Sequence, residues 1–311
     1  MLIDEKNPLI FMHIPKTGGM SLFTAFCKLW GTRIADLYNV TTANPRPAAD
    51  AIRARDKCLY CGHFPFGLHE WFDRPVYYAS VLRQPVERVV SLYHYVQPML
   101  AGVRRTMADK GLSAEQVFAG GKVADYYRDF VPWIEGEQTA EAFFSCPSAD
   151  LDNGMVRRFS GVGLAPGRCP PEALERAMEN IEKCFSVVGR LDRYGDTLTL
   201  LERKLGLPGL PENRVNVNAR KPKSSELSPA LQERIEAMNA LDLALYDWVG
   251  QRFDEELADP SPPIKVPGGR RKDFQNVSLW LAVGNSPLRD AAMEARGVPP
   301  RPQPLVRHYY S

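Results

Sequence analysis

Short apolar runs alternate with amphipathic stretches along most of this chain. Four runs are typical of buried strands, since they are rich in apolar, β-branched and aromatic residues: 9–14, 57–62, 76–82 and 185–189. Apolar positions at helical spacing follow the first and third runs, and an amphipathic helix over 171–184 leads into the fourth. Strands that alternate with helices in this order predict an α/β fold, with a parallel sheet and helices on both faces.

The same pattern divides the chain into a domain over residues 1–255 and a Pro-rich C-terminal arm over 256–311. Two further helices are expected in the domain, over 192–205 and from 229 to about 253. Residues 97–141 have an irregular pattern, and we interpret them as a helical insertion over the acceptor side of the site. The arm is either a loose tail or a segment that packs on the core or on a second subunit, which would support a homo-oligomer.

A glycine-rich turn follows the first strand and leads directly into a helix. Its residues are Pro15, Lys16, Thr17, Gly18, Gly19, Met20 and Ser21. Backbone amides at such a helix start point outward, the helix dipole favours negative charge, and glycine lets a ligand approach the backbone. The turn therefore predicts a phosphate or sulfate site, although a turn that only joins strand to helix would look similar. Lys16 and Thr17 precede the glycines, unlike the G-x-x-x-x-G-K-[ST] order of ATP-binding loops.

A second unit of the same kind follows the strand over 76–82. Arg83 comes at the end of this strand, Pro85 suits the first position of a helix, and Ser91 lies about two turns into that helix. The planar guanidinium of arginine suits bidentate phosphate contacts. Arg83 and Ser91 are therefore predicted to meet a second phosphate, whereas taken singly each would be an ordinary surface residue.

Together the two units resemble sulfotransferases that use 3′-phosphoadenosine-5′-phosphosulfate (PAPS). The turn resembles the family's 5′-phosphosulfate loop, most closely in the branch related to heparan sulfate 2-O-sulfotransferase, and residues 82–93 resemble its 3′-phosphate motif. Met20 replaces the usual threonine, and Gln84 replaces the usual aspartate, which predicts the loss of a helix-capping acceptor. The resemblance implies a P-loop-NTPase-like sulfotransferase fold, PAPS as the donor, 3′,5′-ADP as the product, and no metal.

The resemblance also implies roles for particular residues. The turn would hold the 5′-phosphate, and Lys16 would stabilise the oxygen that leaves with it. Four residues are expected at the 3′-phosphate, the last two from a late basic loop: Arg83, Ser91, Arg220 and Lys221.

A base is expected between the two units. Gly62-His63 ends the second strand and matches a Gly-His of the family whose histidine is taken to deprotonate the acceptor hydroxyl, so this role falls to His63. A histidine with an ordinary pKa near ~6.5 can be neutral at cellular pH. The rival bases are His69, His94, Glu70 and Glu87. On the acceptor side we expect His94 and one of two arginines, Arg157 or Arg158.

Composition sets the cellular context. Cys58-x-x-Cys61 suggests a metal or redox site, but thiols three apart on a strand would point to opposite faces, and the other four cysteines lie at no zinc-site spacing. Unpatterned cysteines indicate a reducing compartment. The net charge of +2 argues against nucleic-acid binding, and no apolar run approaches the ~20 residues of a membrane span. We expect a soluble, bacterial-like, cytoplasmic protein, unlike the Golgi-anchored animal relatives.

The leading hypothesis is therefore transfer of a sulfuryl group from PAPS to an acceptor hydroxyl, with a carbohydrate favoured over lipid, small-metabolite and peptide acceptors. One alternative is a nucleotide kinase or NTPase-like enzyme of the same broad fold, which the missing Gly-Lys-Ser/Thr disfavours. The other is a non-catalytic binding module, which the retention of Lys16, His63, Arg83 and Ser91 disfavours.

Overall fold

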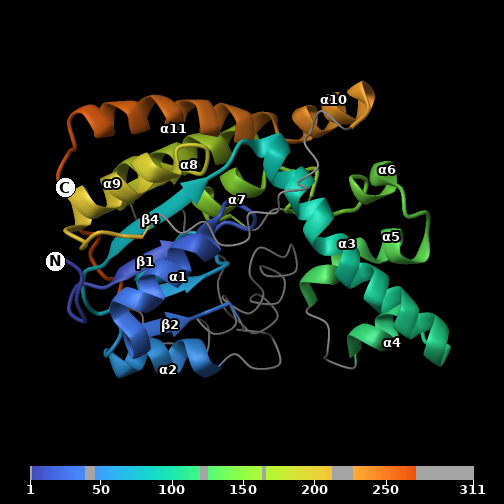
Figure 1. The fold of residues 1–311 in the computed structure, drawn as a ribbon, viewed down its shortest axis with the longest axis horizontal. Helices are drawn as coiled ribbons and strands as arrows, with labels where there is room; N and C mark the ends of the chain where they lie inside the picture. Colours follow the sequence, from blue (N-terminus) through green and yellow to red (C-terminus); the bar gives the residue numbers. More distant parts are fainter. Residues whose placement is uncertain (1, 39–45, 120–124, 163–165, 212–226, 271–311) are drawn as a thin grey trace.

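The computed structural model describes five stretches of the chain, and Figure 1 shows their arrangement. These stretches are residues 2–38, 46–119, 125–162, 166–211 and 227–270. A five-stranded sheet lies between layers of helices, and a further group of helices lies beside it. This architecture confirms the α/β fold expected from the sequence.

The sheet has the strand order β2-β3-β1-β4-β5, and every neighbouring pair is parallel. The strands are β1 (Leu9–Met12), β2 (Ile34–Asp36), β3 (Leu59–Gly62), β4 (Tyr77–Leu82) and β5 (Phe185–Arg190). β1 is central and buried along its whole length, which explains its unbroken apolar sequence. The short strand β2 was not predicted, because its three residues carry too little pattern to be recognised.

The side chains of β1 alternate between the two faces of the sheet. Leu9 and Phe11 pack in one apolar cluster, and Ile10 and Met12 pack in the other. The first cluster is covered by α1 (Gly19–Trp30) and α9 (Tyr194–Leu205). The second is covered by α2 (Arg46–Ala54), α7 (Gly154–Ser160), α8 (Pro171–Cys184) and α11 (Ala240–Ala258).

Helix α3 (Pro85–Lys110) carries the chain from the sheet into a third apolar cluster, visible beside the sheet in Figure 1. The helix continues through Pro98, so the insertion expected from residue 97 grows out of α3 and does not begin as a separate unit. The smaller elements of this region are α4 (Ala114–Ala119), η3 (Asp125–Phe130), α5 (Val131–Glu135) and α6 (Ala140–Phe143). The turns η1 (Gly31–Arg33) and η2 (Leu68–Trp71) complete the set outside it.

One long helix was expected from 229 to about 253, and the structure has two. α10 (Pro229–Met238) ends at Asn239, and α11 begins with the next residue. The Asn239 side chain is buried and donates to the backbone oxygens of Leu151 (2.9 Å) and Ile235 (3.0 Å). An asparagine that bonds to neighbouring backbone competes with helix continuation, which explains the break.

The first part of the Pro-rich arm packs on the core. Ser186 of β5 exchanges hydrogen bonds with the backbone of Ile264, and Val266 forms an antiparallel bridge with Val76. The Gly269 amide then donates to the carbonyl oxygen of residue 69 at 3.1 Å. Residues up to 270 are therefore part of the domain, and an oligomer formed through the arm stays a prediction because residues 271–311 lie outside the described stretches.

A buried charge joins α3 to the second helix layer. Arg88 is 0% exposed; its Nη2 donates to the Asp150 carbonyl oxygen at 2.7 Å and lies 3.7 Å from the Asp242 carboxylate. Asp242 also accepts hydrogen bonds from the amides of Met155 and Val156 at the start of α7. Burial raises the pKa of Asp242, and Arg88 and these amides offset part of that rise. One guanidinium and one carboxylate thus hold α3, α7 and α11 together.

We expect Arg88→Ala to lower the free energy of unfolding by about 3–5 kcal/mol, because it leaves buried carboxylate charge without its partner. Arg53→Ala is the matched control: Arg53 pairs with Asp50 at 3.7 Å on the surface, and its loss should cost less than about 1 kcal/mol. Denaturant unfolding of both variants measures the difference. Similar losses for the two variants would contradict the structural role given to Arg88.

Candidate active site

The candidate site lies at the carboxyl edge of the sheet, where ligands bind in open parallel sheets. Met12 at the end of β1 pairs with Gly62 at the end of β3, so His13 and His63 leave the sheet side by side. Arg83 leaves β4 on the other side of β1. Parallel pairing thus brings together three sequence units that are up to 70 residues apart.

The glycine-rich turn has a shape that larger residues would disturb. Gly18 has φ +81°, and a Cβ added there would lie 2.4 Å from a methyl carbon of Leu191. A Cβ on Gly19 would lie 2.1 Å from the His13 ring. No side chain caps the start of α1. Uncapped amides at a helix start are available to bind an anion. These observations fit the predicted phosphate or sulfate site.

The other turn residues divide into structural and open positions. The Thr17 side chain is fully buried, and its hydroxyl donates to the Ile14 carbonyl oxygen at 2.9 Å, so it holds the turn closed. Ser21 is also buried, and its amide bonds to the Gly18 oxygen at 3.0 Å. Met20 is exposed beside them. Cofactor contacts by the turn residues from Pro15 onward stay predictions, with the Thr17 hydroxyl already engaged inside the turn.

The two anion units contact each other directly. Arg83 Nη1 donates to the Lys16 carbonyl oxygen at 3.3 Å, and its Nη2 lies 3.5 Å from Glu87. Glu87, Ser91 and Tyr95 follow at four-residue spacing and share one face of α3. The Lys16 ammonium lies 3.7 Å from the centroid of the Tyr95 ring, so this face of α3 is turned toward the anion turn. Ser91 lies half-buried between the two contacts, which fits its predicted place at a second phosphate.

Gln84 corrects one sequence expectation. Its side-chain oxygen accepts a hydrogen bond from the Glu87 amide at 2.8 Å, so it caps the start of α3 although glutamine replaces the usual aspartate. The longer side chain reaches the same amide that aspartate would cap. The predicted loss of a capping acceptor is therefore wrong.

His63 is held in one orientation and kept neutral. Its Nδ1 lies 2.8 Å from the His13 carbonyl oxygen; since a carbonyl only accepts, Nδ1 carries the proton and Nε2 is left as an acceptor. The residue is exposed, but the His13 and Tyr38 rings lie against its imidazole. Removal of the ring from water lowers the pKa of His63 to about 4; the charges of Arg158 and Lys16 act in the same direction, and the hydrogen bond to His13 and the charge of Asp150 oppose it. The side chain therefore has the protonation state that a base requires.

His13 and Tyr38 were missed by the sequence analysis, yet they form the wall behind His63. The rings of His13 and His63 are 4.6 Å apart, and Tyr38 lies edge-on to both. His13 Nδ1 is 2.5 Å from the Tyr38 hydroxyl, which is 3.0 Å from the Cys61 sulfur. Burial, with nearby positive charge, lowers the pKa of His13 well below its ordinary value. His13 occupies the position after β1 that His63 occupies after β3, and this parallel was the available signal.

The cysteines also differ from expectation in one respect. Cys58 and Cys61 are both buried in the same apolar cluster, because Cys58 precedes β3 and escapes the strand's alternation. Both are free thiols, and burial raises the pKa of Cys58 to about 11 and that of Cys61 further. They pack as apolar residues.

The two arginines predicted to face the acceptor are buried instead. Arg157 is 1% exposed and pairs with Asp152, and Arg158 is 4% exposed and donates to Asp150 at 2.5 Å. The prediction that one of them lines an open cleft is wrong, since each guanidinium is used inside the fold. Arg158 still acts on the site, because its charge contributes to the low pKa of His63.

The rival bases are less well placed than His63. His69 and Glu70 are buried in the η2 turn, where the His69 Nδ1 lies 3.2 Å from the Tyr78 hydroxyl. Glu87 is paired with Arg83. His94 is half-buried with its ring 4.9 Å from that of Tyr93, and its acceptor role stays a prediction. Two further residues of the prediction lie outside the described stretches: Arg220 and Lys221.

The insertion reaches the site through η3. Asp129 hydrogen-bonds to Ser148, and burial together with Asp150 raises the pKa of Asp129 to about 6. The Tyr127 phenol hydrogen-bonds to that of Tyr95, the residue beneath Lys16. The insertion therefore contacts Tyr95 beside the anion turn and interacts with Ser148 and Asp150, and its place over the acceptor stays a prediction.

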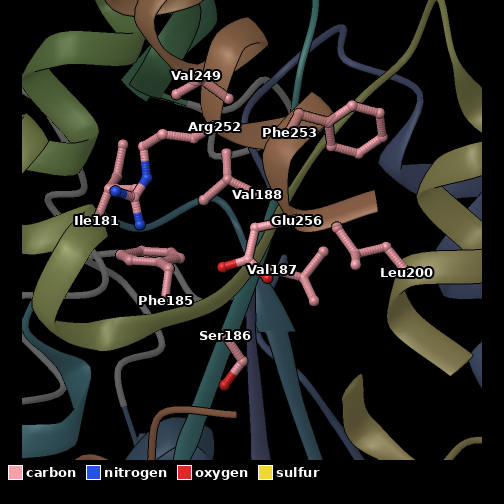
Figure 2. Close-up of a pocket in the computed structure, with 10 residues that line it drawn as sticks. All are labelled: Ile181, Phe185, Ser186, Val187, Val188, Leu200, Val249, Arg252, Phe253 and Glu256. Atoms are coloured by element: carbon pink, nitrogen blue, oxygen red, sulfur yellow. The ribbon is translucent and has the colours of Figure 1, made fainter. Parts of the chain in front are cut away.

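Figure 2 shows a separate cavity at the other end of β5. Its walls come from β5, α8, α9 and α11, and they are mainly apolar, with Arg252 and Glu256 as the charged members. Neither the glycine-rich turn, His63 nor Arg83 is among its lining residues. Within the described stretches, no group of three or more His, Cys, Asp or Glu side chains is placed to hold a metal ion. None of the helices described is both long and apolar enough to cross a membrane.

Comparison with known proteins agrees with this geometry. Galactose-3-O-sulfotransferase 3 of Bos taurus is 24% identical over 290 residues, which cover 85% of this chain and 62% of the relative. Galactose-3-O-sulfotransferase 2 of Mus musculus is 24% identical over 210 residues, which cover 66% of this chain and 48% of the relative. The chain thus spans about half to three-fifths of these relatives. A model of the sulfotransferase family matches residues 1–249, and the chain therefore belongs to the sulfotransferase family.

Proposed function

We propose that this protein transfers a sulfuryl group from PAPS to a hydroxyl of a carbohydrate acceptor, with His63 as the base. The observation that carries the proposal is the contact between the two anion units beside a neutral histidine. Arg83 donates a hydrogen bond to the backbone of Lys16, and the positive charge of Lys16 contributes to the lowered pKa of His63. A site for an anion with two phosphoryl ends and a site for proton removal thus share one sheet edge.

The described residues fit such a donor. The uncapped start of α1 and the Lys16 ammonium suit the 5′-phosphosulfate. Arg83 and Ser91 suit the 3′-phosphate, which would compete with Glu87 for the guanidinium. PAPS supplies the sulfuryl group, whose bond to the phosphate oxygen breaks as the acceptor oxygen bonds to sulfur.

The protein side of the reaction follows from charge and protonation. The His63 Nε2 accepts the proton of the acceptor hydroxyl, while the His13 carbonyl oxygen holds the opposite nitrogen. Lys16 stabilises the negative charge that develops on the leaving oxygen. Sulfuryl transfer, like phosphoryl transfer, mainly requires correctly placed charge. The residues assigned here supply that charge without a metal ion.

A galactose-containing saccharide is the acceptor that the relatives favour, since both are named as galactose sulfotransferases. The order of the anion turn resembles the heparan sulfate 2-O branch, which modifies a different sugar hydroxyl. Both observations support a carbohydrate, and the position of the modified hydroxyl is a question for product analysis. A cytoplasmic location is proposed on the sequence pattern alone.

Binding of 3′,5′-ADP is expected to raise the melting temperature far more than ATP with magnesium. At a hundredfold excess over Kd, a ligand of the native state adds about 2.7 kcal/mol, which corresponds to roughly 5–10 °C for a domain of this size. Thermal denaturation with each nucleotide measures the shift. Equal shifts would favour the kinase or NTPase alternative, and no shift with either would favour a non-catalytic module.

Transfer itself is tested with ³⁵S-labelled PAPS and a panel of acceptors. We expect label in a galactoside such as lactose or N-acetyllactosamine and not in a phenol or a peptide hydroxyl. Mass spectrometry of the product then locates the sulfated hydroxyl. Label confined to the phenol or the peptide would reject the carbohydrate acceptor while leaving the transferase assignment intact.

Replacement of His63 should slow turnover without weakening binding of the donor nucleotide. His63→Asn is expected to lower kcat by about 10²- to 10⁴-fold, the usual contribution of a positioned base, and to leave 3′,5′-ADP affinity unchanged. Since a lowered pKa keeps the ring neutral into more acidic solution, wild-type kcat should stay level down to pH 5 and fall only near 4. His94→Asn serves as the control and should change KM more than kcat. An acidic limb centred near pH 6.5 would contradict the assignment.

A further inference from the structure

Tyr95 is an aromatic residue that the core does not require. Its side chain is 53% exposed, although the neighbouring apolar residues of α3 pack in the third apolar cluster, beside the sheet. Its ring lies under the Lys16 ammonium, 3.7 Å from Nζ to centroid. A cation within about 6 Å of an aromatic centroid is attracted to the ring face. The ring is therefore placed by what it contacts, not by burial.

The backbone of Lys16 is fixed independently of this contact. Lys16 has φ +71°, a left-handed conformation that non-glycine residues seldom adopt, and its carbonyl oxygen accepts from Arg83 at 3.3 Å. A lysine side chain on a fixed backbone still has several rotamers, so the contacts of its ammonium decide where the charge lies. The Tyr95 ring is one of these contacts.

Tyr95 is itself held from the opposite side. Its phenol hydrogen-bonds to Tyr127 in η3, and Tyr127 donates to the Met99 sulfur at 3.3 Å. Two residues further along η3, Asp129 hydrogen-bonds to Ser148 and lies near Asp150. Asp150 in turn pairs with Arg158. The chain of contacts from Lys16 through Tyr95 to η3 therefore joins the anion turn to the insertion.

We propose that Tyr95 is a positioning residue for sulfuryl transfer: its ring holds the Lys16 ammonium beside the anion turn, and its phenol ties that ring to the insertion. The inference rests on the proposed function, because the held cation is the one assigned to the leaving oxygen. It adds that the acceptor-side insertion and the donor-side cation are placed by the same side chain. Substitution at Tyr95 should thus affect turnover of bound substrates more than binding of the nucleotide.

The contact can be observed without any turnover. Reductive ¹³C-methylation of the lysines keeps their charge and gives each an NMR signal, and Lys16→Arg identifies the signal of Lys16. A group above an aromatic ring is shifted upfield by the ring current, so the Lys16 signal should lie upfield in wild type and in Tyr95→Phe. In Tyr95→Leu it should move to the position of an ordinary exposed lysine. Because Tyr95 is half exposed, this variant removes little buried surface and should fold.

Kinetics then test the role. Tyr95→Leu should lower kcat roughly 2- to 5-fold, the strength of a cation–π contact at an exposed site, and up to about 30-fold where bound substrates exclude water. Its 3′,5′-ADP affinity should change by a smaller factor than kcat, and Tyr95→Phe should recover most of the loss. A Lys16 signal that stays upfield in Tyr95→Leu, full activity of that variant, or no recovery with phenylalanine would each overturn the proposal.

The proposed function can fail separately from this inference. If wild-type protein does not bind 3′,5′-ADP, the donor assignment falls, while the Lys16 signal in the ligand-free protein still reports whether Tyr95 holds the ammonium. If 3′,5′-ADP binds and sulfate is transferred but Tyr95→Leu behaves as wild type, only the positioning role is lost.

Discussion

Parallel pairing of β1 with β3 and β4 is the constraint on which the site depends. The His13 amide donates to the Gly62 oxygen at 3.1 Å, and Ser80 of β4 donates through its hydroxyl to the Met12 oxygen at 2.7 Å. These bonds fix the residue at which each strand leaves the sheet. A shift of one residue in the register of a strand would turn each of its side chains to the other face. The anion turn, His63 and Arg83 meet because the register is fixed: β1 and β3 end at paired residues, and β4 continues beyond the end of β1 as far as the residue before Arg83.

A second constraint holds the helices that support this edge. Asp242 caps the start of α7, and Asn153 accepts from the amides of Leu241 (3.0 Å) and Asp242 (3.1 Å) at the start of α11. Arg88 connects this exchange to α3. Buried pairs of this kind seldom add net stability over apolar packing, but breaking one leaves a costly unpaired charge. The network therefore fixes the position of α3 relative to α7 and α11, and with it the face that Ser91 and Tyr95 present.

The sequence predicted what local pattern determines. The strand ends, the glycine-rich turn and the helix start at Pro85 each depend on a few consecutive residues, and the structure confirms these elements. Contacts between distant residues were not predictable in the same way. In the sequence, Arg157 and Arg158 cannot be distinguished from arginines that line a cleft. Their burial becomes evident only from their pairing with Asp152 and Asp150 in the structure. Tyr95 lies outside both motifs; its spacing from Ser91 places it on the same face of α3, but its contact with Lys16 joins residues far apart in the sequence and could not be predicted.

The most direct test of His63 as the base is its protonation state, measured by ¹⁵N NMR of histidine-labelled protein with His63→Asn to assign its signals. We expect a protonated Nδ1, held by the His13 carbonyl, and an unprotonated Nε2, both unchanged from pH 8 to pH 5. Titration of the ring near pH 6.5, or a proton on Nε2 in the neutral form, would contradict the claim that this sheet edge presents a ready base to the acceptor.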